Sequence, residues 1–384
     1  MLDFFNHDEK KVEYIELIYD LIFVYIIGRN NSLVSHITDG FISFETFLTY
    51  FLCTLITIQI WYSTTLFINR YGSNSFSEYI GLFINMYLLY YIAEGTRIHW
   101  ENYYYRYNIA WMLIMLNIAF QYYLKYRKIH STEPWKCVNI RQYILTLIIQ
   151  AAIIAAGIGV FALTGFPAAP AAMVFGIIMA IISRKKSDLV ALDFSHLTER
   201  VMLYIVFTFG EMIIAIASYF SGEITPGNVY YSTMAFFIVV CLFMSYGFMY
   251  DRLLDRDMNI SGNTYMIIHI FIILALSNLT NALEFMRESH ISLLPKSIYL
   301  AASFAVYYIF LLMTAPFTKG YRTGKGNLWR MSLSIGISLG LMMVFYKNSV
   351  ISIAVSAAMA FSVLLLEYRY WKDSVQPYEK HQSF

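Results

Sequence analysis

Three carboxylates near the N-terminus lie within a run of apolar residues. Glu13, Glu16 and Asp20 are three and four residues apart, which places them on one face of a helix, and Asn31 continues the same stripe. A carboxylate in apolar surroundings pairs with a basic group, binds a cation or takes up a proton, because an unpaired buried charge is costly. The spacing therefore predicts a helix with one proton- or cation-binding face.

A second polar stripe lies near the middle of the chain. It consists of His196, Arg200, Tyr204, Thr208 and Glu211, which follow one another at steps of four or three residues. Such steps predict a single helix face. We expect Arg200 near one end of this helix and Glu211 close to its middle.

The two stripes suggest partners for each other. Arg200 is expected to meet Glu13 or Glu16 near one surface, whereas Asp20 and Glu211 are expected deeper, at similar depth and facing a shared interior. We expect no basic residue at the depth of these two acids, so simple ion pairing is not predicted for them. A structural role as helix fasteners is the alternative for all of these carboxylates.

Further polar residues are predicted to be mostly structural. A third line runs through His269, Ser277, Asn278, Thr280, Asn281 and Glu284. His269 is expected to be a packed polar side chain rather than a ligand. Glu94 with Arg97, and Glu284 with Arg287, are expected to form pairs three residues apart on their helices.

The elements that position these groups must be membrane helices. Hydrophobic residues make up 59% of the 384 positions and charged residues 14%, whereas soluble proteins carry about 25% charged residues. A water-facing shell cannot be built from so little charge, so the solvent is lipid. We expect an all-α, polytopic transmembrane bundle in which the first apolar run stays as the first span rather than a cleaved signal peptide.

Twelve apolar segments are long enough to be candidate spans. They are residues 12–36, 43–68, 77–98, 102–124, 141–163, 167–183, 199–220, 229–250, 263–287, 296–316, 328–346 and 349–368. With the N-terminus in the cytoplasm, alternation leaves 21 of the 27 Lys and Arg residues on the cytoplasmic side. This asymmetry follows the positive-inside rule and predicts both termini in the cytoplasm.

The midpoint of the chain suggests two halves. Residues 1–186 and 187–384 would each contain six spans, and Asp20 and Glu211 align when the first spans of the halves are superposed. An even number of spans per half predicts parallel repeats related by an axis along the membrane normal.

Several function classes receive no support. The net charge of +2 argues against a nucleic-acid partner, and three scattered cysteines argue against a zinc site or a disulfide framework. We expect no metal and no cofactor. Nucleotide-binding and hydrolase motifs are absent, so an enzyme is not favoured; a lipid-modifying enzyme ranks last.

Two segments resemble signatures of the low temperature requirement protein A (LtrA) family. Residues 12–24 (VEYIELIYDLIFV) resemble its opening ELFFDLVFV, and residues 196–200 (HLTER) followed by 210–211 (GE) resemble HLAERF…LGE. The resemblance runs over residues 12–370, although the mid-helix arginine of the fourth helix is missing from residues 112–117. It implies a multi-pass bacterial membrane protein. The family name refers to growth in the cold and implies no chemistry.

Two functions remain open after this reading. The first is a transporter or flippase-like protein of the cell membrane, which moves a small molecule, an ion or a lipid and couples to protons or cations. Its predicted binding residues are Asp20, Glu211, Glu16, Arg200, Glu13, His196, Tyr204, Thr208, His269 and Asn281. The second is a membrane scaffold or accessory subunit, in which the carboxylates only fasten helices.

Overall fold

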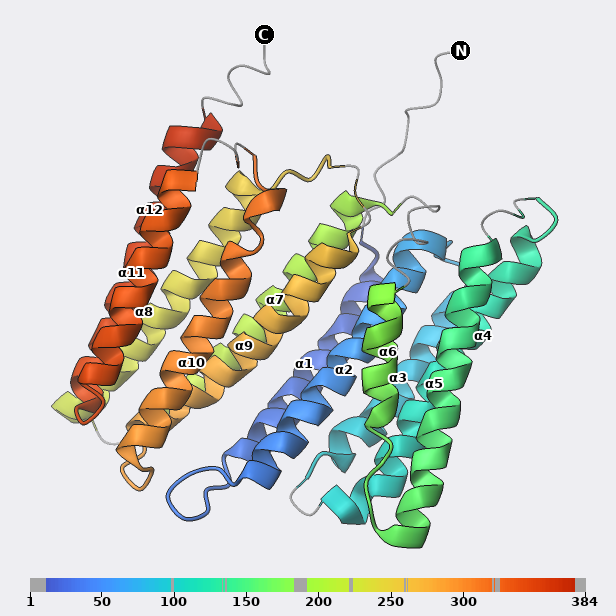
Figure 1. The fold of residues 1–384 in the computed structure, drawn as a ribbon, viewed down its shortest axis with the longest axis horizontal. Helices are drawn as coiled ribbons and strands as arrows, with labels where there is room; N and C mark the ends of the chain where they lie inside the picture. The colour runs from blue at the N-terminus through green and yellow to red at the C-terminus, as the bar shows by residue number, and fades with distance from the viewer. Residues whose placement is uncertain are drawn as a thin grey trace. The chain divides into compact units, whose positions relative to one another are not determined.

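The chain folds into helices throughout the part that the structure describes. The computed structural model describes residues 12–97, 100–132, 134, 137–182, 192–220, 224–258, 260, 262–319, 321 and 325–376. Figure 1 shows the α-helices in chain order. They are α1 (Tyr14–Val34), α2 (Phe44–Tyr71), α3 (Phe76–Gly95), α4 (Tyr104–Ile129), α5 (Cys137–Thr164), α6 (Ala171–Ile182), α7 (Phe194–Ile216), α8 (Pro226–Phe248), α9 (Asn263–Arg287), α10 (Leu293–Leu312), α11 (Lys325–Val344) and α12 (Ser349–Tyr370).

The helices agree one by one with the predicted apolar segments. Within the described residues, nine are long and apolar enough to cross a membrane. Three fall outside this criterion: α3, α4 and the 12-residue α6. The prediction of an all-α polytopic bundle is confirmed, while the number of helices that cross the bilayer is not fixed by length and composition.

The chain forms two compact units that do not follow the chain order strictly. Unit 1 comprises Met1–Val34, Phe44–Tyr204 and Asn259–Met266, and unit 2 comprises Ser35–Ser43, Ile205–Met258 and Ile267–Phe384. Within unit 1, α1 packs on α2 and α3, and α4 packs on α3 and α5; within unit 2, α12 packs on α8 and α11. The helices α7 and α9 contribute residues to both units. The origin of the chain from two six-helix repeats stays a prediction.

Polar residues just before several helices determine where those helices begin. Asp193 precedes α7, and its Oδ1 accepts the His196 N–H at 2.9 Å. Thr225 precedes α8 and accepts the Asn228 N–H at 3.2 Å. Asn348 precedes α12, and its Oδ1 accepts the N–H groups of Val350 and Ile351. Each side chain replaces a helical acceptor that the first turn lacks.

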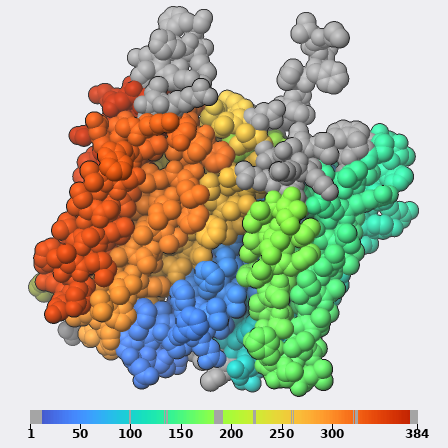
Figure 2. Space-filling model, in the orientation of Figure 1, coloured from blue at the N-terminus to red at the C-terminus, as the bar shows by residue number. Residues whose placement is uncertain are grey.

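Large apolar side chains cover the outer surface of the helices. On α11, Trp329, Leu333, Ile337 and Leu341 follow one another at four-residue steps and are between 41% and 68% exposed. The atoms of α11 and α12 lie in the red to red-orange part of the surface in Figure 2. A continuous exposed apolar row is unfavourable in water and is what a lipid solvent selects.

Small residues allow close approach of backbones in unit 1. A Cβ atom added at Gly157 of α5 would lie 2.5 Å from the backbone of Ala169, two residues before α6 begins. The Tyr104 hydroxyl accepts the Ala169 N–H at 3.0 Å, so the same contact is also held by a hydrogen bond. The small residues here thus allow the close packing that is typical of helices in membranes.

Candidate functional site

A buried ion-pair cluster lies inside unit 1, where α7 meets α1. Arg200 Nη2 donates to Asp20 Oδ1 at 2.7 Å, and Arg200 Nε donates to Asp20 Oδ2 at 3.4 Å. The third nitrogen, Nη1, lies 3.2 Å from Glu16 Oε2. All three side chains are at most 1% exposed. One guanidinium therefore bridges two carboxylates that lie one helical turn apart.

The helix α2 completes the surroundings of Asp20. Trp61 Nε1 donates to Asp20 Oδ1 at 2.9 Å, and the Trp61 ring lies 4.6 Å from the ring of Tyr204. Tyr204 follows Arg200 by one turn and is completely buried. Aromatic rings thus exclude water from the ion pair, which strengthens its electrostatics because the local dielectric constant is low.

His196 connects the cluster to a second residue of α2. Asn69 Nδ2 lies 3.0 Å from His196 Nδ1, while Asn69 Oδ1 accepts the Asp193 N–H at 3.2 Å, which fixes the orientation of the amide. An amide NH₂ group can only donate, so Nδ1 of the imidazole accepts. The proton of a neutral His196 is therefore on Nε2, which lies 3.4 Å from Glu16 Oε2.

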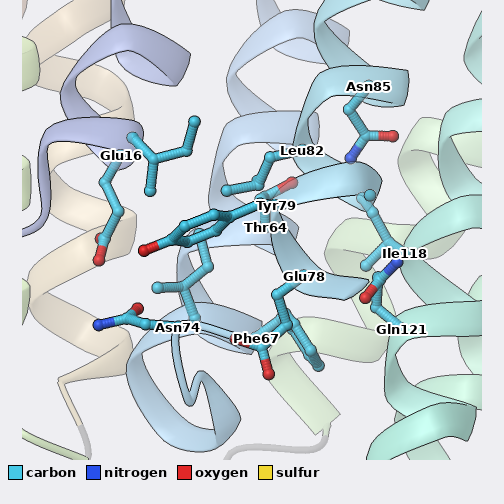
Figure 3. Close-up of a pocket in the computed structure, with 13 residues that line it drawn as sticks. Glu16, Thr64, Phe67, Asn74, Glu78, Tyr79, Leu82, Asn85, Ile118 and Gln121 are labelled. Carbon is cyan, nitrogen blue, oxygen red and sulfur yellow. The ribbon is translucent and has the colours of Figure 1, made fainter. Parts of the chain in front are cut away.

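A small polar cavity lies next to Glu16. The cavity volume is about 20 Å³, which is enough for one or two water molecules. Its polar lining includes Glu16, Asn74, Glu78 and Asn85. Figure 3 shows the Tyr79 ring across the cavity with its hydroxyl pointing toward Glu16.

The mouth of this cavity carries further polar groups. Asn74 is exposed, and its Nδ2 donates to Glu13 Oε1 at 3.1 Å. A polar route thus leads from the exposed loop before α3 to the buried Glu16. Water and side-chain oxygens along such a route can form hydrogen bonds with one another.

Comparison with known families identifies the chain. The family model of bacterial low temperature requirement A protein (LtrA) matches residues 11–366. The chain belongs to the LtrA family. Comparisons with curated proteins and with solved structures found no match. The protein is thus a polytopic helical membrane protein of the LtrA family, as the two signatures implied.

The two LtrA-like signatures meet in the buried cluster. The segment that resembles the first one carries Glu16 and Asp20, and the segment that resembles the second one carries His196 and Arg200. The resemblance was read from residue types alone, whereas the structure brings these four side chains into one connected site.

One statement drawn from the sequence is wrong. A basic residue does reach the depth of Asp20, because Arg200 is six residues into α7 and Asp20 is six residues into α1. Both lie about 9 Å along their helices at 1.5 Å per residue. The helix was expected to begin at residue 199, but Asp193 caps it five residues earlier, so Arg200 lies deeper than expected.

The remaining predicted site residues of the LtrA chain divide between the units. Glu13 and Tyr204 lie beside the cluster in unit 1, whereas Thr208, Glu211, His269 and Asn281 belong to unit 2. In unit 2, Glu211 is partly buried and Glu284 lies within range of its charge. Glu211 comes eleven residues after Arg200 in the sequence of α7. A pairing of Asp20 with Glu211 stays a prediction.

The two expected surface pairs have different outcomes. Glu94 is confirmed as the partner of Arg97, and it also accepts the Tyr25 hydroxyl at 2.6 Å. The pairing of Glu284 with Arg287 is wrong for the described chain, because Arg287 Nη1 donates to the Ser218 carbonyl oxygen instead. A backbone carbonyl near a helix end is a strong acceptor and competes with the carboxylate.

Sequence reasoning missed two members of the cluster, Trp61 and Asn69. Both lie in α2, whose sequence reads as an apolar span, and an indole or an amide in such a span usually packs in the core. The available signal was chemical: an indole N–H and a carboxamide each require a hydrogen-bond partner when buried. Two such groups eight residues apart in an apolar helix indicate a polar partner on a neighbouring helix.

Proposed function

We propose that this LtrA protein is a membrane transporter whose coupling site is the cluster of Glu16, Asp20, His196 and Arg200. The proposal rests mainly on the 3.4 Å contact between His196 Nε2 and Glu16 Oε2. Glu16 also lines the small polar cavity. Intramembrane ionisable residues that face a protein interior mark proton relays and ion pathways in other membrane proteins.

The formal charges of the four side chains support a proton site. With His196 neutral, two carboxylates and one guanidinium leave this cluster with a charge of −1. One proton on Glu16 or on His196 neutralises it. Because an unbalanced charge is expensive in a buried position, the cluster favours the uptake of one proton, which the cavity beside Glu16 would deliver.

Arg200 would convert this proton into a change of helix packing. In the unprotonated cluster the guanidinium holds both Glu16 and Asp20. A proton on Glu16 removes one of the two attractions, while the bidentate bond to Asp20 remains. The attraction between α7 and the first turns of α1 is then weaker. A contact that switches between a strong and a weak state is what alternating access requires.

Unit 2 would contribute a second acidic region. Glu211 and Glu284 lie within range of each other's charge, and their proximity favours the binding of a proton or of a cation between them. The substrate class in this proposal is a small molecule, an ion or a lipid that crosses the cell membrane. Both termini would lie in the cytoplasm, as the distribution of Lys and Arg indicates.

Purified protein in lipid vesicles tests this proposal. Vesicles that contain a pH-sensitive dye are exposed to gradients of sodium, potassium, chloride and amino acids, one at a time. We expect proton movement above that of protein-free vesicles in at least one gradient. The Asp20→Asn, Glu211→Gln double variant should lose it. Wild-type vesicles that move no protons in any gradient, or a double variant that moves them at the wild-type rate, would refute the proposal.

A scaffold function is the second candidate, and one observation favours it. The cluster ties α1, α2 and α7 together through Asp20, Trp61 and Arg200, all at most 1% exposed. A scaffold needs only the stability of these contacts. It predicts that neutralising the carboxylates lowers the melting temperature and the yield, with no proton flux to lose. Melting curves and flux measured on the same preparation separate the two functions.

A further inference from the structure

A carboxylic acid outside the cluster is buried near the end of α12 in unit 2. Glu367 is 4% exposed. The helix continues for eight more residues to Val375, which is about 12 Å along its axis. Its Oε2 atom has no hydrogen-bond partner among the described residues. The salt bridges of the described chain do not include Glu367 either, which distinguishes it from Glu16 and Asp20.

Hydroxyl groups from two other helices surround this carboxyl. Ser245 of α8 lies beside it, and Tyr307 and Tyr308 of α10 lie within range of its charge. All three are at most 1% exposed. The Ser245 Oγ and the Tyr308 hydroxyl have no hydrogen-bond partner among the described residues. Ser245 Oγ lies within hydrogen-bonding reach of the Glu367 carboxyl, so among the described residues these three buried polar groups find partners only in one another.

The local helix geometry also distinguishes this place. Two of the three helices that carry the polar groups, α8 and α12, continue into a π-helical turn a few residues further on. The turns are Met249–Leu253 after α8 and Trp371–Val375 after α12, and they contact each other. Single π-helical turns cost hydrogen-bond energy and occur frequently at functional sites.

The ionisable groups on the surrounding helices cannot balance a charge on Glu367. The ionisable neighbours from α10 are Tyr307 and Tyr308, which are neutral at pH 7. On α9, His269 packs against the ring of Tyr246.

Most charged side chains of the adjoining elements are exposed: Lys325 and Arg330 on α11, Asp251 and Arg252 on the turn after α8, Arg369 on α12, and Lys372 and Asp373 on the turn after it. Asp255, Arg256 and Lys319, in the segments that follow α8 and α10, are half-buried, and none of them forms a salt bridge with Glu367; Arg256 pairs with Asp251. Within the described residues, nothing therefore neutralises an ionised Glu367.

We propose that Glu367 is a proton-binding site of unit 2, which holds its proton at neutral pH. The protonated acid supplies the O–H donor that Ser245 Oγ can accept, and its carbonyl oxygen can accept the hydrogen of the Tyr308 hydroxyl. One proton thus provides partners for all three groups, whereas the ionised form would leave a charge without a counterion. The site is distinct from the cluster in unit 1 and does not depend on the transport proposal.

Infrared difference spectroscopy on the protein in lipid tests this site, because the carbonyl stretch of a protonated carboxylic acid is resolved from that of a carboxylate. At pH 7 the wild-type minus Glu367→Gln spectrum should contain one protonated acid band. Glu94→Gln is the matched control, because Glu94 is 45% exposed and paired with Arg97; its difference spectrum should show a carboxylate instead. Both variants are first checked for an unchanged melting temperature.

A pH titration adds an independent readout. The Glu367 band of the wild type should decrease as the pH rises, and the Ser245→Ala, Tyr308→Phe variant should lose it at a different pH, because the partners of the proton are gone. If the spectrum shows an ionised carboxylate that disappears with Glu367→Gln at pH 7, the proposal is overturned. A band that the Ser245→Ala, Tyr308→Phe variant leaves unchanged at every pH would overturn the assignment of these hydroxyls as partners.

Discussion

Replacing Arg200 by methionine removes the cation of the buried cluster while keeping a side chain of similar length. Glu16 and Asp20 then remain buried, at most 1% exposed, without their guanidinium. Opposite charges about 4 Å apart attract each other by about 4 kcal/mol at an effective dielectric constant of about 20. Measured losses on removing one partner of a buried ion pair are about 3–5 kcal/mol. We expect Arg200→Met to lose stability in this range.

The loss can be measured as a shift of the melting temperature. For a cooperative unit of about 200 residues, 3–5 kcal/mol corresponds to a decrease of roughly 6–20 °C. The three cysteines, Cys53, Cys137 and Cys241, are all buried, so a thiol-reactive dye reports unfolding in detergent. Cys53 and Cys137 belong to unit 1. The peptides that contain Cys53 and Cys137 should therefore react with the dye at a lower temperature in the Arg200→Met protein than in the wild type.

Two controls make this experiment specific. Arg97→Met removes a cation whose pair with Glu94 is 45% exposed on both sides, and it should cost less than about 1 kcal/mol. Combining Arg200→Met with Glu16→Gln and Asp20→Asn removes the whole set of charges. This triple variant should regain most of the lost stability, because it leaves no charge buried alone.

The pH gives a further check on the same variants. Protons neutralise the two stranded carboxylates of Arg200→Met, so the difference in stability from the wild type should become smaller as the pH falls from 8 to 5. An Arg200→Met protein that melts with the wild type at pH 7, or a triple variant that melts lower than Arg200→Met, would refute the ion-pair reasoning.

Three further expectations concern other parts of the chain. Trp61→Phe removes the indole N–H that Asp20 accepts at 2.9 Å and should cost about 1–3 kcal/mol in a denaturation assay; an unchanged unfolding midpoint would contradict this. Gly157→Val places methyl groups where even a Cβ would lie 2.5 Å from backbone, so its yield in detergent should fall, while Gly159→Val, with open space around it, should express normally. With twelve spans, a membrane-impermeant maleimide should label Thr225→Cys in intact cells and Ser131→Cys only after permeabilisation; the reverse pattern would contradict the predicted topology.

Much of the fold could be predicted because the solvent constrains it strongly. In lipid, backbone groups must bond within their own segment, so each long apolar run becomes a helix. The ends were harder to predict. The helix α7 begins at Phe194 because Asp193 caps it, and the run of hydrophobic residues that defined the predicted span does not include that cap. This five-residue difference is the reason why no basic partner was predicted for Asp20.

Side-chain partners depended on features that a helix face cannot reveal. Glu16, Asp20, His196 and Arg200 could be singled out from the sequence because charged residues are rare in apolar spans. Which of them meet depends on the reach of the arginine side chain and on the packing of two distant segments. Glu367 was not predicted as a site residue, because Arg369 and Lys372 follow it closely. A carboxylate beside basic residues at the end of a span is typical of a charge at the membrane interface.

The most direct test of the proposed coupling site is the proton flux of the Glu16→Gln variant in vesicles. Gln keeps the shape of the side chain beside His196 but cannot take up a proton. Under the gradient that drives wild-type flux, we expect Glu16→Gln to move protons at least about tenfold more slowly, with Glu94→Gln at the wild-type rate. Melting curves of the same vesicle preparations confirm that both variants are folded. A folded Glu16→Gln protein that moves protons as fast as the wild type would contradict the account.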